Sequence, residues 1–153
     1  MEPKKISNEI LIMATPATVW TILTDPNETK EYMFGCRTVS SWEPGAPLLW
    51  NALVNGKDHT YVKGWIVSID PPRELQYTVI DPNSPMADIP ENYLGVRYRL
   101  SAAGNNTMLT VTQDGFEHAE DGEKRWLDVY NNGEGWNPLL KQVKAQAEAY
   151  RPA

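Results

Sequence analysis

Alternating apolar and polar residues predict β-strands through the middle of the chain. Residues 96–100 (VRYRL) and 109–113 (LTVTQ) alternate with period two, which is typical of a strand with one buried and one solvated face. Asn55-Gly56 is the favoured signal for a two-residue hairpin turn. The stretch from Cys36 to Gly115 is therefore predicted to be a run of antiparallel strands. The strand-like segments within it are residues 47–54, 59–69, 73–80, 93–100 and 108–114.

A first strand and two short helices are predicted before that region. Residues 5–13 (KISNEILIM) are rich enough in Ile and Leu to form the strand. Thr15 followed by Pro16 is the signature of an N-cap with proline at the first helical position. Asp25-Pro26 ends this helix, because the residue before a proline is disfavoured in the helical conformation. Residues 27–32 are expected to form the second short helix.

Helical periodicity replaces the strand pattern in the last thirty or so residues. The pattern predicts one long amphipathic helix from Glu120 to Tyr150, whose first half is weakened by Gly133, Gly135 and Pro138. A bend or a frayed turn is expected at Pro138, because proline removes a backbone donor. This order of elements predicts an α+β domain with a curved antiparallel sheet around one long helix. The residues predicted to share the inner face of that helix are Trp126, Val129, Tyr130, Gly133, Trp136, Leu140, Val143 and Ala147.

The parity of the strands predicts which side chains point inward. Gln113 shares the face of Leu109 and Val111, and a polar side chain there needs a hydrogen-bond partner from protein, water or a ligand. Gly133, on the inner face of the helix, either leaves room beneath the helix or permits close packing. The inward set predicted for the strands is Trp50, Trp65, Val67, Leu75, Tyr77, Val96, Tyr98, Leu109, Val111 and Gln113.

One segment does not fit the hairpin pattern. Residues 81–92 (DPNSPMADIPEN) are Pro-rich and too long for a hairpin tip. Loops of that length are often functional or mobile. We therefore expect this loop to cover the entrance to a binding site.

Composition adds a preference for an amphipathic interior. The chain has six Trp and seven Tyr but only two Phe. Trp and Tyr combine a large apolar body with a polar tip, which suits a half-wet concave surface. The alternative, that these rings simply fill the core and the surface, stays open.

Length and charge narrow the classes of protein. The 153 residues suffice for one domain, taken as residues 1–153, and the net charge of −6 argues against a nucleic-acid partner. Cys36 is the single cysteine, so neither a disulfide nor a thiolate zinc site is expected. No cofactor, metal or catalytic residue is predicted. Without an apolar run of membrane-spanning length, we expect no membrane insertion and a cytoplasmic location.

Several segments, in order, resemble a known family. They are ILIMATPATVWTILTDPNETKEYMFG, WEPGAPLLW, VKGWIVSIDPPRELQYTV, TMLTVTQDGF and the later GW and LL pairs at residues 135–136 and 139–140. Together they look like the activator of heat-shock-protein-90 ATPase homologue-like family, within the START and birch-pollen-allergen-like (SRPBCC) superfamily. The resemblance covers about residues 6–149. It implies a helix-grip fold, in which a seven-stranded antiparallel sheet wraps around the C-terminal helix, encloses a hydrophobic cavity and is closed at one end by two short helices.

The leading functional hypothesis is a module that binds a small hydrophobic or amphipathic molecule, such as a lipid, an aromatic compound or a polyketide, between the sheet and the C-terminal helix. A cyclase or dehydratase using the same cavity is an alternative, for which Asp114, Glu117 or His118 could reach the cavity mouth. A stress protein that contacts a chaperone is another, and a homodimer contact also stays open. The residues expected to line the ligand site are Trp50, Trp65, Tyr77, Tyr98, Gln113, Trp126, Tyr130, Gly133 and Trp136.

Overall fold

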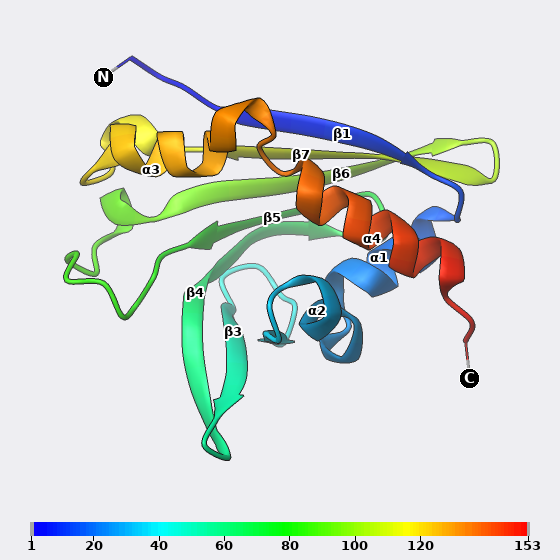
Figure 1. Ribbon diagram of the computed structural model, residues 1–153, viewed down its shortest axis with the longest axis horizontal. Helices are drawn as coiled ribbons and strands as arrows, with labels where there is room; N and C mark the ends of the chain where they lie inside the picture. Colours follow the sequence, from blue (N-terminus) through cyan, green and yellow to red (C-terminus); the bar gives the residue numbers. More distant parts are fainter. Residues whose placement is uncertain (1, 153) are drawn as a thin grey trace.

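A seven-stranded antiparallel sheet with the order β1-β7-β6-β5-β4-β3-β2 organises the computed structural model, which describes residues 2–152 (Figure 1). Strands β2 to β7 pair in chain order, each with the next one along the chain. Strand β1 pairs with β7, so β1 and β2 lie at opposite edges of the sheet. The expected α+β class with an antiparallel sheet is thus confirmed. The strands are β1 (Ile6–Ile12), β2 (Arg37–Val39), β3 (Pro47–Val54), β4 (Lys57–Asp70), β5 (Glu74–Val79), β6 (Leu94–Ala103) and β7 (Asn106–Asp114).

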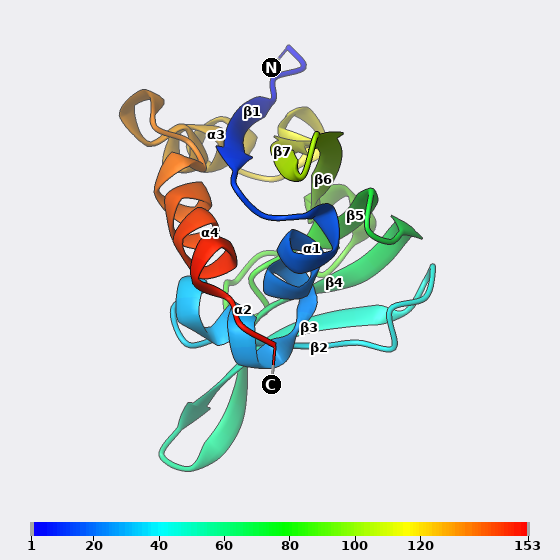
Figure 2. The same ribbon diagram turned by 90° about the vertical axis from the view of Figure 1, so that its right-hand side faces the viewer.

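The sheet is curved, and the helices lie on its inner side. Figure 2 shows the strands as an arc from β1 to β2, with α1 and α4 on the inner side of the arc. The last helix, α4, packs against β1, α1 and α2. The helices are α1 (Pro16–Thr24), α2 (Pro26–Tyr32), α3 (Gly122–Tyr130) and α4 (Asn137–Ala149), with short 3₁₀ turns η1 (Pro90–Asn92), η2 (Phe116–His118) and η3 (Asn131–Gly133).

The two N-terminal helices begin and end where the sequence predicts. The hydroxyl of Thr15 accepts a hydrogen bond from the backbone N–H of Thr18, and Pro16 is the first helical residue. Asp25 has extended backbone angles and ends α1, while its carboxylate caps α2 by accepting from the N–H of Asn27 at 2.8 Å. One residue therefore stops one helix and starts the next.

The single long helix expected over residues 120–150 is wrong, because the chain breaks it into α3 and α4. Asn131, Asn132, Gly133 and Gly135 all have positive φ angles, between 50° and 93°. Asn and Gly tolerate this left-handed conformation, which ends a helix. The expected bend at Pro138 is also wrong, because Pro138 lies in the first turn of α4, where its missing N–H costs no hydrogen bond.

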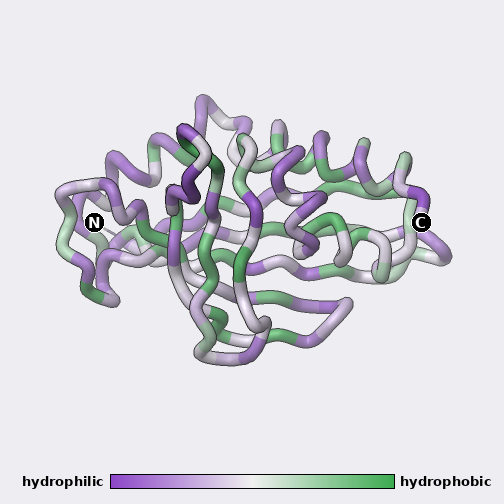
Figure 3. The backbone as a smooth tube through the Cα atoms, turned by 90° about the horizontal axis from the view of Figure 1, so that it is seen from below, coloured by the Kyte–Doolittle hydropathy of each residue, from purple (hydrophilic) through white to green (hydrophobic). Residues whose placement is uncertain are grey.

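Alternation along β6 and β7 is confirmed by burial. Val96 and Tyr98 are buried while the arginines between and after them are exposed, and Leu109, Val111 and Gln113 are buried in β7. In Figure 3, apolar and polar residues alternate along the strands of the backbone tube. Leu140, Val143 and Ala147 of α4 are buried against this inner face, as predicted.

Parity fails in β4, where Trp65 and Val67 do not point inward. Ile66 is fully buried and pairs with Tyr77, whereas Val67 is 42% exposed. The register shifts between Ile66 and Ser68, so the inward positions change from even to odd numbers at that bulge. Trp65 lies on the outer face, where its ring packs against that of Tyr93 with the ring centroids 4.7 Å apart. A bulge of one residue thus puts Trp65 and Val67 on the face of the sheet opposite to the one predicted.

Within residues 2–152, no helix combines the length and apolar character needed to cross a membrane.

Candidate ligand-binding cavity

An open cavity of about 930 Å³ lies between the inner face of the sheet, the segment that joins α2 to β2, and the start of α4. Ligand pockets typically occupy about 300–1,000 Å³. Strands from β3 to β7 each contribute at least one side chain to its wall. The lining residues are Lys30, Met33, Phe34, Gly35, Cys36, Arg37, Trp50, Ala52, Leu53, Tyr61, Val62, Tyr77, Val79, Val96, Gln113, Trp136 and Leu139.

The wall is mainly apolar and aromatic. Trp50 and Tyr77 stand side by side with ring centroids 6.1 Å apart. The hydroxyl of Tyr77 is 2.8 Å from that of Tyr98, which is buried behind it. Burial raises the pKa of Tyr77 well above its ordinary value and that of Tyr98 to about 12, so both rings carry neutral phenols at physiological pH.

The inner end of the cavity is held together by Trp136 and Gln113. The indole Nε1–H of Trp136 donates to Oε1 of Gln113 at 3.0 Å, and its backbone N–H donates to Oδ1 of Asn8 at 2.9 Å. Its ring also meets Tyr98 edge-to-face, with centroids 6.1 Å apart and planes at 82°. Trp136 therefore joins the start of α4 to strands β1, β6 and β7.

Gly135 permits this close approach. A Cβ at that position would lie 2.4 Å from Oδ1 of Asn8, the atom that accepts from Trp136, and the φ angle of Gly135 is +54°. The turn that breaks the C-terminal helix thus also places Trp136 in the cavity wall.

Apolar side chains surround the mouth of the cavity. Phe34, between α2 and β2, is 88% exposed, and Leu53 and Tyr61 of the β3–β4 hairpin are also exposed. That hairpin extends away from the rest of the molecule in Figure 1. Large apolar groups exposed together mark a binding surface more often than isolated ones do.

The charged side chains of the lining are both cations, Lys30 and Arg37. Arg37 forms an ion pair with Asp58, while Lys30 has no ion-pair partner among residues 2–152. Asp114, Glu117 and His118 were expected to be able to reach the cavity mouth, but they are absent from the lining. Cys36 is buried in the wall, and its desolvation raises the pKa of the thiol.

Four of the nine expected site residues meet in this cavity: Trp50, Tyr77, Gln113 and Trp136. Tyr98 supports the wall from behind through its hydroxyl contact with Tyr77. Trp65 faces the other side of the sheet, as described above. Five of these six residues lie on strands, and strand parity predicted the face of four of them correctly; it failed for Trp65, next to the β4 bulge.

Trp126, Tyr130 and Gly133 lie outside the cavity. Trp126 and Tyr130 stack on each other with centroids 4.7 Å apart and planes at 16°, and the ammonium of Lys4 lies 4.4 Å from the Trp126 ring. Gly133 lies in the turn between α3 and α4 rather than within a helix. It therefore does not occupy the inner face of a helix above the sheet, as was expected. The broken helix separates these residues from Trp136.

Sequence reasoning missed two groups of lining residues: Met33 to Cys36 between α2 and β2 with the adjoining Arg37, and residues of the β3–β4 hairpin such as Ala52 and Val62. The first group has no periodicity to reveal it. The hairpin group could have been found from the Asn55-Gly56 turn. Asn55 and Gly56 have the positive φ angles of the predicted two-residue turn, and this turn fixes which residues of β3 and β4 pair.

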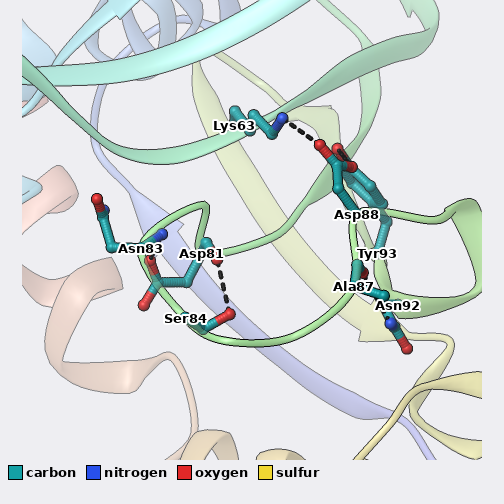
Figure 4. A network of polar contacts seen from close by, with 8 residues as sticks. All are labelled: Lys63, Asp81, Asn83, Ser84, Ala87, Asp88, Asn92 and Tyr93. Carbon is teal, nitrogen blue, oxygen red and sulfur yellow. Dashed lines mark hydrogen bonds and ion pairs between the residues drawn. The ribbon is translucent and has the colours of Figure 1, made fainter.

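The loop at residues 81–92 does not cover the cavity, which corrects the expectation for it. None of its residues contributes to the lining. Figure 4 shows Asp88 of the loop paired with Lys63 of β4. The carboxylate of Asp88 also accepts a hydrogen bond from the hydroxyl of Tyr93 at 2.5 Å. Arg125 of α3 donates to the carbonyl of Asn92 at 2.7 Å. These contacts tie the loop to β4 and α3 instead.

In the described part of the chain, no group of three or more His, Cys, Asp or Glu side chains is arranged to hold a metal ion.

Comparison with known proteins gives a family and a set of similar folds. The family model described as "Activator of Hsp90 ATPase homolog 1-like protein" matches residues 13–148. The solution structure of ChR145 from Cytophaga hutchinsonii is 32% identical, with a TM-score of 0.73 over 97% of both chains. No curated protein matches the chain significantly.

Two further structures are similar in fold at lower identity. MLL2253 from Mesorhizobium loti is 17% identical, with a TM-score of 0.71 over 97% of this chain and 100% of that one. The Aha1 dimer from Colwellia psychrerythraea is 16% identical, with a TM-score of 0.68 over 97% of this chain and 99% of that one.

Proposed function

The chain belongs to the Activator of Hsp90 ATPase homolog 1-like family, and on that premise we propose that it binds a small apolar or amphipathic molecule, such as a lipid, an aromatic compound or a polyketide. The observation that carries the proposal is the open cavity of about 930 Å³, whose wall is built from aromatic and aliphatic side chains. Each methylene group that leaves water for such a wall contributes about 0.8 kcal/mol. Binding therefore needs little beyond shape and apolar contact.

The lining also suits an amphipathic ligand. An apolar body would contact Trp50, Tyr77 and Val96, while a polar end would reach water and the ammonium of Lys30 at the mouth. Pockets with mostly apolar walls and a few polar groups bind ligands of this kind.

The proposal is tested by titrating chemically varied apolar ligands, including 1-anilinonaphthalene-8-sulfonate and decanoate, while following tryptophan fluorescence. Trp50 and Trp136 lie in the wall, so an occupied cavity changes their emission. The variant Ala52→Phe places a ring in the cavity and should weaken binding roughly tenfold, or about 1.4 kcal/mol.

Ala102→Phe is the matched control, because Ala102 is exposed on β6 and away from the cavity. It should bind as the unchanged protein does. No fluorescence response to any of the ligands, or equal loss of affinity in both variants, would count against a binding function for this cavity.

A further inference from the structure

Gln113 has a buried amide whose two ends have different surroundings. The residue is 6% exposed and lies in the cavity wall. Its Oε1 accepts from the indole of Trp136, whereas its Nε2 has no hydrogen-bond partner among residues 2–152. Among the described residues, every side-chain nitrogen or oxygen that is itself completely shielded has a hydrogen-bond partner. The amide nitrogen must therefore be accessible from the open space beside it.

Trp136 fixes the orientation of this amide. An indole N–H can only donate, so the atom that faces it must be the carbonyl oxygen of Gln113. Turning the amide over would place two donors against each other and lose the 3.0 Å hydrogen bond. Trp136 is itself held by Asn8 and Tyr98. Gln113 thus presents its N–H donors away from the ring.

The space that receives these donors is mostly apolar. Gln113 borders the main cavity, where Val96 is its cross-strand neighbour. It also borders a smaller pocket of about 240 Å³ at the junction of α3 and α4, which shares Trp136 and Leu139 with the main cavity and has Asp128 and Asn131 as its other polar lining residues. A hydrogen bond formed in such surroundings is stronger than one formed in water.

We infer that the inner end of the cavity recognises a neutral carbonyl oxygen, so that the ligand class is an apolar molecule bearing a ketone, ester or amide. The inference rests on the proposed binding function. A carbonyl oxygen has two lone pairs and no proton, which complements an amide NH₂ group. An ionised carboxylate fits this end less well, because Gln113 offers neutral donors and an unpaired charge is costly to bury.

Two probes of nearly equal shape test this, 2-acetylnaphthalene and 2-ethylnaphthalene, which differ by a carbonyl oxygen in place of two hydrogens. The measured quantity is the ratio of their dissociation constants by calorimetry. In Gln113→Met, the preference for the ketone should fall roughly 3- to 10-fold relative to the unchanged protein. Comparing the ratio between proteins cancels the different hydration of the two probes.

Gln113→Glu separates the loss of the donor from the loss of the Trp136 contact. Glutamate keeps an oxygen for the indole N–H but presents no amide hydrogens, so it should lose the same preference. Gln142→Met is the matched control, because Gln142 is exposed on α4 and bonds only to Gln146 among the described residues. Its ratio should be unchanged.

A second readout uses the unchanged protein, in case the variants fold poorly. The side-chain NH₂ signals of ¹⁵N-labelled Gln113 should move downfield with the ketone and much less with the hydrocarbon. If both probes bind, yet the ratio is unchanged in Gln113→Met or the NH₂ signals respond equally, the inference is overturned and the binding function stands. If neither naphthalene binds while 1-anilinonaphthalene-8-sulfonate or decanoate does, the inference alone is overturned. If none of these ligands binds, the binding function is overturned with it.

Discussion

At the scale of single residues, Cys36 reports on the cavity because it is the single cysteine and lies in the wall. Burial raises the pKa of its thiol, so at a given pH less of the reactive thiolate is present than in the unfolded chain. We expect alkylation to be slow in the folded protein and slower still with a ligand bound. The rate should rise with pH around a midpoint above that of the unfolded chain.

The measurement is the rate of reaction with iodoacetamide against pH, for the folded protein and for the protein in urea. Equal rates in both, with no protection by a bound ligand, would contradict the placement of Cys36 in the cavity wall.

Some features of the candidate site could be predicted from single residues and their strand positions. Gln113 was identified from parity as an inward polar side chain that needs a partner, and its partner is Trp136. The pairing itself could not be predicted, because it depends on the turn at Gly135 that brings Trp136 to β7. Trp126 and Trp136 share one face of an ideal helix, but only Trp136 meets the cavity.

At the scale of elements, the close approach of β4 and β5 depends on Gly64. A Cβ there would lie 1.7 Å from the carbonyl oxygen of Thr78, which is backbone and cannot swing away. The hydroxyl of Thr78 also accepts from the N–H of Trp65 at 3.1 Å. Gly64→Ala should therefore lower the free energy of unfolding by about 1–3 kcal/mol, as overpacking does.

Gly95→Ala on β6 is the matched control, measured by the same urea denaturation. Its Cβ would meet Oδ1 of Asp114 at 2.4 Å, but that carboxylate is the end of an exposed side chain that can rotate. We expect a clearly smaller loss of stability. Equal losses in the two variants would contradict the reason given for Gly64.

Elements were predictable where their signals are local. The Thr15-Pro16 and Asp25-Pro26 pairs fix the ends of the first helix, and the Asn55-Gly56 turn fixes a hairpin. The long C-terminal helix failed because apolar periodicity was given more weight than the run Asn131-Asn132-Gly133, which is itself a helix-ending signal. The bulge after Ile66 has no comparable signal in the sequence.

At the scale of the whole molecule, the sheet, the end of α2 with the segment after it, and the start of α4 together border an open space that no single element defines. The α+β class and the antiparallel sheet followed from the order of the elements, since strands and helices are segregated along the chain. The position of the cavity did not, because its mouth is built from the aperiodic segment after α2 and from one hairpin. Such a site depends on tertiary packing.

The most direct test of ligand binding in the cavity uses the six tryptophans as site-specific NMR probes. Their indole N–H signals are recorded by ¹⁵N NMR before and after saturation with an apolar ligand such as 2-acetylnaphthalene. We expect the signals of Trp50 and Trp136 to move, since both rings line the cavity, while those of Trp65 and Trp126 stay in place. Movement confined to Trp65 and Trp126, or no movement at any ligand concentration, would contradict ligand binding in the cavity.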